Sequence, residues 1–215
     1  MSSPFPSGKG LFFAGKQQLA ESQEETNMRD DCEDVPTFYC QTLEYFGPCE
    51  YVRQQCAELY CKIWQEPPWC EDFWKPQEVL QTLREEIQRP DAKCYMAIRT
   101  EQLIVIGFTW GYSVDRQELT EIAGGSQLDF ITENTPSVFY IDELGVDPAS
   151  RHNRVGSSLT KELIGHAQKC GHRRIIVRTD LRAVPARKLY SRFGFTELDV
   201  KDGRHDNRNY WLLDI

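Results

Sequence analysis

The stretch VDPASRHNRVGSSLTKELIGHAQKCG, residues 146–171, runs from the end of an apolar segment through a short basic loop into a long amphipathic segment. The spacing of its apolar residues predicts a helix over 154–169, and Gly171 is suited to end that helix. The first N–H groups of a helix have no partner within it, and the helix dipole adds partial positive charge there. The stretch therefore predicts an anion site where this helix begins.

The loop before the helix supplies groups that a phosphate would need. Gly156 allows a close approach to the backbone, and Ser157 and Ser158 add hydroxyl donors. Arg151 and Arg154 add positive charge. Many helices begin with a basic turn and bind nothing, so a basic surface turn is the alternative interpretation.

The chain around this stretch alternates strand-like and helix-like runs, which implies a mixed sheet with helices on both faces. The segment 115–135 is expected to be a polar loop that contains a helical turn. We expect helices over 49–64, 75–88, 154–169 and 183–193, and strands over 35–43, 94–100, 103–114, 138–146, 173–180, 195–200 and 208–215. A single domain over 35–215 follows, preceded by a polar extension over 1–34 that we expect to be disordered or laid over the surface.

The composition excludes several classes of protein. A net charge of −8 over 215 residues argues against general nucleic-acid binding, which needs a basic surface. No apolar run is long enough to cross a bilayer, and the first residues lack the continuous apolar core of a signal peptide. We therefore expect a cytoplasmic protein without membrane partners.

Eight cysteines raise the question of disulfides or zinc. None forms a CxxC pair, and none has a histidine at ligand spacing, so we expect no metal site. Reduced thiols that pack as small apolar side chains are the simpler interpretation. The cysteines are Cys32, Cys40, Cys49, Cys56, Cys61, Cys70, Cys94 and Cys170.

Two motifs resemble the GNAT superfamily, the acyl-CoA N-acyltransferases. The run R-x-x-x-x-G after LGVDP is similar to motif A of that family, Q/R-x-x-G-x-G/A, with Arg151 at the first position and Gly156 at the last. Arg154 replaces the middle glycine, and in ordinary helical backbone it would still offer its N–H. The second motif, AVPARKLYSRFGF over 183–195, resembles the helix N-x-x-A-x-x-L-Y-x-x-x-G-F. There Ala183 replaces the asparagine, and the matching residues are Ala186, Leu189, Tyr190, Gly194 and Phe195.

The resemblance implies an α/β (α+β) fold with a mixed, mostly antiparallel central sheet and helices on both faces. In the family, the strand before motif A separates from its neighbour, and the pantetheine arm of acetyl-CoA binds there like an added strand. The loop from Arg151 to Ser157 would hold the pyrophosphate. The positions that this resemblance assigns to the cofactor are Leu144, Gly145, Val146, Arg151, His152, Asn153, Arg154, Val155, Gly156, Ser157, Ser158, Ala183, Ala186 and Tyr190.

The resemblance also implies acetyl transfer to a primary amine by direct attack in a ternary complex. Tyr190 matches the tyrosine that stands near the cofactor's sulfur and can protonate it, whereas its pattern alone favours a core residue. The N–H of Leu144 is a candidate donor to the thioester carbonyl. Asp142 and Glu143 are the candidate bases. Strand alternation allows only one of them to face the substrate, which favours Asp142, but a bulge would favour Glu143.

Several aromatic residues have two interpretations. Trp110 and Tyr112 would line an acceptor pocket with Asp142, or belong to the core. The group Trp64, Trp69, Phe73 and Trp74 would form a substrate lid, or cap the core beneath a long loop. His152 would contact a phosphate, or be solvated in the loop.

The acceptor is expected to be a small-molecule or peptide amine, and the acidic balance favours a cationic one. Family members often form homodimers, so a homodimer is compatible with the sequence. The rival functions are a transferase for a longer acyl chain and a module that binds acyl-CoA without turning it over.

Overall fold

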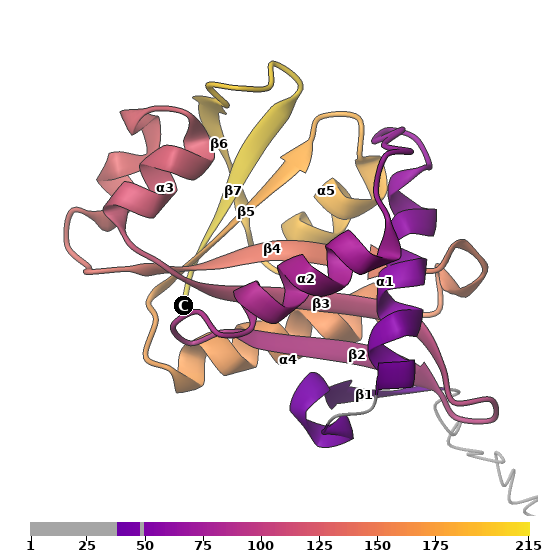
Figure 1. Cartoon of the computed structure of the whole chain (residues 1–215). Coiled ribbons are helices and arrows are strands. Elements are labelled where there is room, and N and C mark those ends of the chain that lie inside the picture. Colours follow the sequence, from indigo (N-terminus) through magenta and orange to yellow (C-terminus); the bar gives the residue numbers. More distant parts are fainter. Residues whose placement is uncertain (1–37, 48–49) are drawn as a thin grey trace, which may run out of the picture. The chain divides into compact units, whose positions relative to one another are not determined.

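The apolar runs form one seven-stranded sheet with the order β1-β2-β3-β4-β5-β7-β6 (Figure 1). Neighbouring strands are antiparallel except β4 and β5, which are parallel, so the predicted mixed and mostly antiparallel sheet is confirmed. The strands are β1 Phe38–Thr42, β2 Lys93–Arg99, β3 Ile104–Val114, β4 Val138–Val146, β5 Arg174–Asp180, β6 Thr196–Lys201 and β7 Arg208–Asp214.

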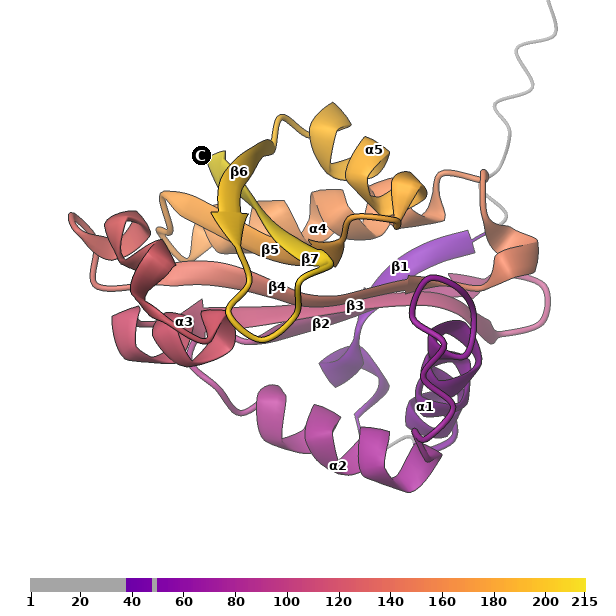
Figure 2. The same cartoon turned by 90° about the horizontal axis from the view of Figure 1, so that it is seen from above.

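This computed structural model describes residues 38–47 and 50–215, which belong to one compact unit. The predicted extension over 1–34 lies outside the described residues. Within them, α1 and α2 cover one face of the sheet, and α4 and α5 cover the other (Figure 2). The helices are α1 Glu50–Trp64, α2 Pro76–Glu86, α3 Arg116–Ala123, α4 Val155–Lys169 and α5 Val184–Arg192.

Helix α1 follows the predicted periodicity with one difference. It buries Cys56, Tyr60 and Ile63 against the sheet, but Tyr51, which the apolar spacing of the sequence would place on the same face, is 67% exposed. Val52 is buried instead. The reason is helical geometry: Val52 lies four residues before Cys56 and shares its face, whereas Tyr51 lies five before and points away.

The segment predicted as a polar loop contains a full helix, α3. Asp115 accepts a hydrogen bond from the Glu118 N–H, and the Glu118 side chain accepts one from the Asp115 N–H. This capping box starts the helix. Leu119 and the following 3₁₀ turn, Ser126–Thr132, then bury apolar side chains beside the sheet.

The described part of the chain shows no helix long and apolar enough to cross a membrane. In the same residues, no group of three or more His, Cys, Asp or Glu side chains is arranged to hold a metal. The described cysteines are free thiols, and those at 56, 61 and 94 are buried. Cys32 and Cys49 lie outside the described residues.

Candidate active site

Strands β4 and β5 separate in the middle of the domain (Figure 1). They pair only over Phe139–Ile141 and Ile175–Val177, after which β4 continues beside β3 alone. Leu144 and Val146, the positions predicted to meet the cofactor, lie in this continuation. Their side chains pack toward α4, so the edge of β4 that faces β5 is bounded by backbone rather than by a neighbouring strand.

The turn from Asp147 to Arg154 leads from β4 into α4. Helix α4 begins at Val155, and its first intrahelical bond runs from the Ser158 N–H to the Arg154 carbonyl. Val155 is buried, so it offers only its backbone, while Ser157 and Ser158 are partly exposed. The first N–H groups of α4 therefore point out of the helix toward the region where β4 and β5 separate.

The backbone at Arg154 differs from our expectation. Its φ of 62° is left-handed, not helical, and His152 has a φ of 67°. The family motif has a glycine at the Arg154 position, and glycine adopts this conformation without strain. Arg154 thus adopts an unfavourable φ at a position where glycine would be unstrained, and its side chain is exposed.

Arg151 and Asn153 are exposed in the same turn. The Arg151 guanidinium donates to the Val146 carbonyl at 3.2 Å and to Glu66 at 2.7 Å. In this structure its charge is therefore paired with the Glu66 carboxylate just beyond the end of α1, and it stabilises the turn. Arg151 can contact a cofactor phosphate, as the sequence predicts, only if its ion pair with Glu66 opens.

Gly156 lies where three elements meet. A Cβ atom there would stand 3.5 Å from Leu189 Cδ2 in α5 and 3.6 Å from Val146 Cγ2 in β4. These are ordinary van der Waals distances, so a methyl group fits but a large side chain must enter the space between β4 and α5. Gly145 is more crowded, because a Cβ there would lie 2.5 Å from the Phe108 ring.

Helix α5 places Tyr190 on the other side of this space. Tyr190 is 4% exposed and packs 5.5 Å from the Phe195 ring, so it is a core residue as its pattern alone favoured. Burial, and then the negative charge of Glu143, raise the pKa of its hydroxyl. The hydroxyl is therefore protonated at neutral pH and can act as a hydrogen-bond donor, and it holds its proton more tightly than an exposed tyrosine does. Ala183 and Ala186 are buried and partly buried in the same region.

A β-bulge changes the side on which the candidate bases lie. Trp110 pairs with Glu143 and Gly111 with Ile141, so Asp142 is an extra residue in β4. Because the bulge interrupts alternation, both carboxylates point to the face covered by α1 and α2. The expectation that only one of them could face this side is wrong.

Each carboxylate accepts a hydrogen bond from a tyrosine. Tyr112 Oη donates to Asp142 Oδ2 at 2.8 Å, and Tyr60 Oη donates to Glu143 Oε1 at 3.0 Å. Burial, and then the charge of Asp142, raise the pKa of Glu143 well above its usual value. Glu143 therefore binds a proton more readily than an exposed glutamate, which suits a general base.

A third carboxyl group, Glu86, joins this pair and was missed from the sequence. It is the last residue of α2, and its carboxyl accepts from Trp110 Nε1 at 2.6 Å and hydrogen-bonds with Asp142. Burial, and then Asp142, raise its pKa to about 8. No local pattern marks Glu86, because only tertiary packing brings the end of α2 to the bulge in β4.

The aromatic residues are mainly core. Trp110 and Tyr112, for which the sequence left an acceptor pocket or the core open, are 2% and 4% exposed and donate to the carboxyl groups. Trp64 stacks on Tyr60 with ring centroids 4.2 Å apart, while Phe73 is 63% exposed. The tryptophans therefore cap the core, and Phe73 alone of that group presents its ring to solvent.

The loop between α1 and α2 is tied to the second half of the domain. Arg208 pairs with Glu71 at 3.3 Å and lies over the Trp69 ring, and Arg182 donates to the Pro68 carbonyl at 3.0 Å. The loop thus bounds the carboxylate-bearing face from the side of β5 and β7.

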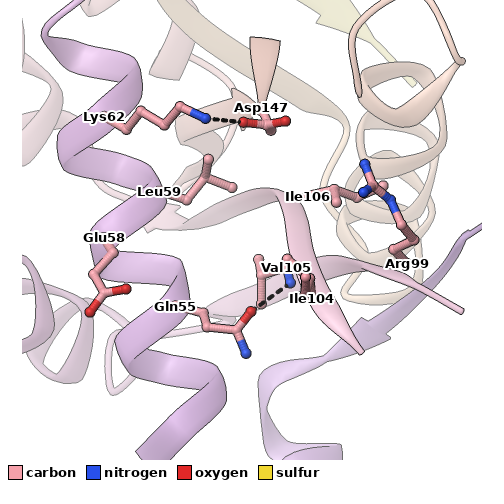
Figure 3. Close-up of a pocket in the computed structure, with 9 residues that line it drawn as sticks. All are labelled: Gln55, Glu58, Leu59, Lys62, Arg99, Ile104, Val105, Ile106 and Asp147. Carbon is pink, nitrogen blue, oxygen red and sulfur yellow. Dashed lines mark hydrogen bonds and ion pairs between the residues drawn. The ribbon is translucent and has the colours of Figure 1, made fainter. Parts of the chain in front are cut away.

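A shallow pocket of about 260 Å³ lies between α1 and the start of β3, next to Asp147 (Figure 3). Lys62 in its wall binds Asp147 at 2.6 Å, and Arg99 donates to Ser150 at 2.9 Å. Because both cations are occupied by the turn before α4, we interpret this pocket as support for the turn rather than as the reaction site.

Comparisons with known proteins agree with this arrangement. The model of the acetyltransferase (GNAT) family matches residues 54–195. A chain of the NatC complex bound to Gag peptide and CoA is similar, with a TM-score of 0.61 and 15% identity over 83% of this chain and 98% of that one.

Two further solved structures are similar at low identity. One is yncA, a putative acetyltransferase from Salmonella typhimurium with acetyl-CoA, with a TM-score of 0.59 and 14% identity over 83% of this chain and 94% of that one. The other is NAA60 of Arabidopsis thaliana with a bisubstrate analogue, with a TM-score of 0.59 and 16% identity over 83% and 98%. A search of curated proteins gave no match.

The fold is shared with the solved acetyltransferase structures named above. The family match covers most of the chain, and the protein belongs to the GNAT acetyltransferase family.

Proposed function

We propose that the protein is an N-acetyltransferase that moves the acetyl group of acetyl-CoA to a cationic primary amine by direct attack in a ternary complex. The observation that carries this proposal is the separation of β4 from β5 after Ile141. It brings the start of α4, the Tyr190 side of α5 and the carboxylates of the β4 bulge to one place.

The residues around this separation fit acetyl-CoA. The first N–H groups of α4 and the hydroxyl groups of Ser157 and Ser158 suit the pyrophosphate. The free edge of β4 beside Leu144 suits the amide groups of the pantetheine arm, which can bond to it as an added strand does. When bound, the thioester supplies the acetyl group. The Leu144 N–H is our candidate donor to its carbonyl oxygen.

The carboxylates of the bulge can bind an ammonium group and take its proton. A free alkylamine has a pKa of about 10.4, so it arrives charged and must lose a proton before its nitrogen can attack. Glu143, whose pKa is raised, can accept that proton at neutral pH. Tyr190, neutral and facing from α5, can give a proton to the departing sulfur.

The charge of this face favours a cationic acceptor. Glu71, Glu86 and Asp142 all act on Glu143 to raise its pKa, so four acidic groups lie close together. A positively charged amine relieves their mutual repulsion. Peptide amino groups remain within this class, since a chain of the NatC complex with bound peptide shares the fold. The cytoplasmic location and the homodimer stay predictions from the sequence.

A panel of amines tests the proposal. Purified protein is incubated with acetyl-CoA and polyamines, aminoglycosides, amino acids or peptides, and thiol release is matched to acetylated product by mass spectrometry. We expect turnover with cationic amines, lowered about 10²–10⁴-fold by Glu143→Gln. Turnover only with a longer acyl-CoA would show that the donor is that acyl-CoA and not acetyl-CoA. Acetyl-CoA binding without thiol release for any amine would refute catalysis and favour a binding module.

A further inference from the structure

Glu86 occupies a position that is unfavourable for a negative charge. It ends α2, where the helix dipole is negative, and its side chain is half-buried beside another carboxyl group. A glutamate in such surroundings is expected to hold its proton. The structure therefore carries a neutral acid next to the proposed base.

The hydrogen bonds of Glu86 indicate where that proton lies. Trp110 Nε1, which can only donate, bonds to Glu86 Oε2 at 2.6 Å. The same carboxyl group also bonds with the Asp142 side chain. Two carboxyl groups can share a hydrogen bond only if one of them is protonated, and Glu86 Oε2 already accepts from the indole. Because this bond with Asp142 raises the pKa of Glu86, we place the proton on Glu86, which donates it to Asp142.

Asp142 is consequently held from two sides. Tyr112 Oη donates to its Oδ2 atom at 2.8 Å, and Glu86 supplies the second donor. Tyr112 is itself fixed, because the Arg89 guanidinium lies 3.7 Å from the centre of its ring. These two donors fix the orientation of the Asp142 carboxylate.

We propose that Glu86 is a positioning residue for acetyl transfer: as a neutral acid it fixes the Asp142 carboxylate together with Tyr112, and it leaves Glu143 as the group that accepts the amine's proton. This inference rests on the proposed function. It assigns separate roles to two carboxylates that neighbour each other in sequence and face the same side.

The balance of the step follows directly. An N–H bond of the ammonium group breaks, and its proton goes to the Glu143 carboxylate. The freed lone pair forms the C–N bond while the C–S bond of the thioester breaks. The sulfur takes a proton from Tyr190, and the second proton that the nitrogen loses restores the Tyr190 hydroxyl. A neutral amide and a thiol leave, and Glu143 releases its proton to solvent. Asp142 stays charged throughout and attracts the cationic acceptor.

Most of the charged and titratable groups around Glu86 and Glu143 raise the pKa values of these two carboxyl groups. Burial and Asp142 raise the pKa of Glu86 to about 8, while Trp110 and Arg89 lower it. Around Glu143, Asp142, Glu86 and Glu71 raise the pKa and the Tyr60 hydroxyl lowers it. The remaining facing groups are the hydroxyls of Tyr112 and Tyr140, which stay neutral because burial and Asp142 raise their pKa values.

Three variants test the inference. Glu86→Ala removes the donor to Asp142 and is expected to lower kcat/KM about 100-fold, the cost of a misplaced catalytic group. Glu86→Gln keeps a donor and an acceptor in the same shape, so it is expected to restore most of that loss. It also cannot ionise, so the fall in kcat/KM that wild type shows above about pH 8 should move to higher pH. Glu85→Gln, on the exposed side of α2, is the matched control and should change neither.

A measurement without substrate separates this inference from the proposed function. In protein labelled with ¹³C at the glutamate carboxyl carbons, NMR should show one resonance titrating near pH 8 that is missing in Glu86→Gln. If wild type turns over no amine, the proposed function fails while this titration still reports on Glu86. If wild type is active but Glu86→Gln is as inactive as Glu86→Ala, or no glutamate titrates near pH 8, the inference is overturned.

Discussion

Replacing Tyr60 by phenylalanine removes one hydroxyl group from the proposed base. Tyr60 is 5% exposed and its Oη donates to Glu143 Oε1 at 3.0 Å. This bond favours the charged form of Glu143 and so lowers its pKa against the opposing effects of burial and Asp142. Without the bond, the pKa of Glu143 rises further.

The size of the effect follows from the kind of bond. A hydrogen bond to a charged group contributes about 1.5–3 kcal/mol, which corresponds to about 1–2 pKa units at 1.36 kcal/mol per unit. Water can replace part of the lost hydroxyl, because Glu143 is partly exposed, so we expect the lower end of this range. Below the pKa the base is protonated and inactive, so kcat/KM at a fixed acidic pH should fall roughly tenfold.

The assay is the pH profile of kcat/KM for acetyl transfer to the best amine of the panel. In Tyr60→Phe the acidic limb should move to higher pH by about one unit, with little change in the plateau. Tyr51→Phe, on the same helix but exposed, should leave the profile unchanged. An acidic limb that stays in place, or moves to lower pH, would contradict Glu143 as the base bonded by Tyr60.

Three further predictions concern stability and the leaving group. Arg154→Gly relieves a φ of 62° and should raise the free energy of unfolding in urea by up to about 1 kcal/mol, whereas a loss would show that the Arg154 side chain stabilises the turn. The pKa of Glu86 is raised to about 8 in the folded state, so wild type loses stability as pH rises from about 4.5 to 8. Relative to wild type, Glu86→Gln should therefore raise the free energy of unfolding by roughly 2–4 kcal/mol more at pH 8 than at pH 5 in the same assay. Equal differences at the two pH values would contradict the raised pKa. Tyr190→Phe should lower kcat at least tenfold with acetyl-CoA affinity unchanged, and an unchanged kcat would limit Tyr190 to core packing.

The order of elements and the start of α4 could be predicted because they depend on local patterns. Apolar periodicity marks β3 and β4, and the basic turn with Gly156 marks the helix that follows. The capping box of α3 was also present in the sequence, as Asp115 followed three residues later by Glu118, and it was overlooked within a polar segment. The arginine at 154 did not itself indicate a left-handed backbone, and the sign that was overlooked is the glycine that the resembled motif has at this position.

The arrangement of the carboxyl groups could not be predicted in the same way. Alternation along β4 assigns Asp142 and Glu143 to opposite faces, and the bulge that brings them together depends on pairing with β3. Glu86 is far away in sequence and has the local pattern of an ordinary helix end. Trp110 and Tyr112 lie beside Asp142, as the sequence suggested. They are buried there and donate hydrogen bonds to Glu86 and Asp142, so they do not form an exposed surface that could contact the acceptor.

The central claim is that acetyl-CoA binds where β4 and β5 separate, with its pyrophosphate at the start of α4. Calorimetry of acetyl-CoA binding to wild type, Gly156→Trp and Gly165→Trp tests it most directly. At position 156 the indole must enter the space between Leu189 and Val146, whereas at position 165 in the same helix a side chain meets open space. We expect micromolar-range binding by wild type and Gly165→Trp and none by folded Gly156→Trp. Equal binding by all three proteins, or no binding by folded wild type, would contradict the claim.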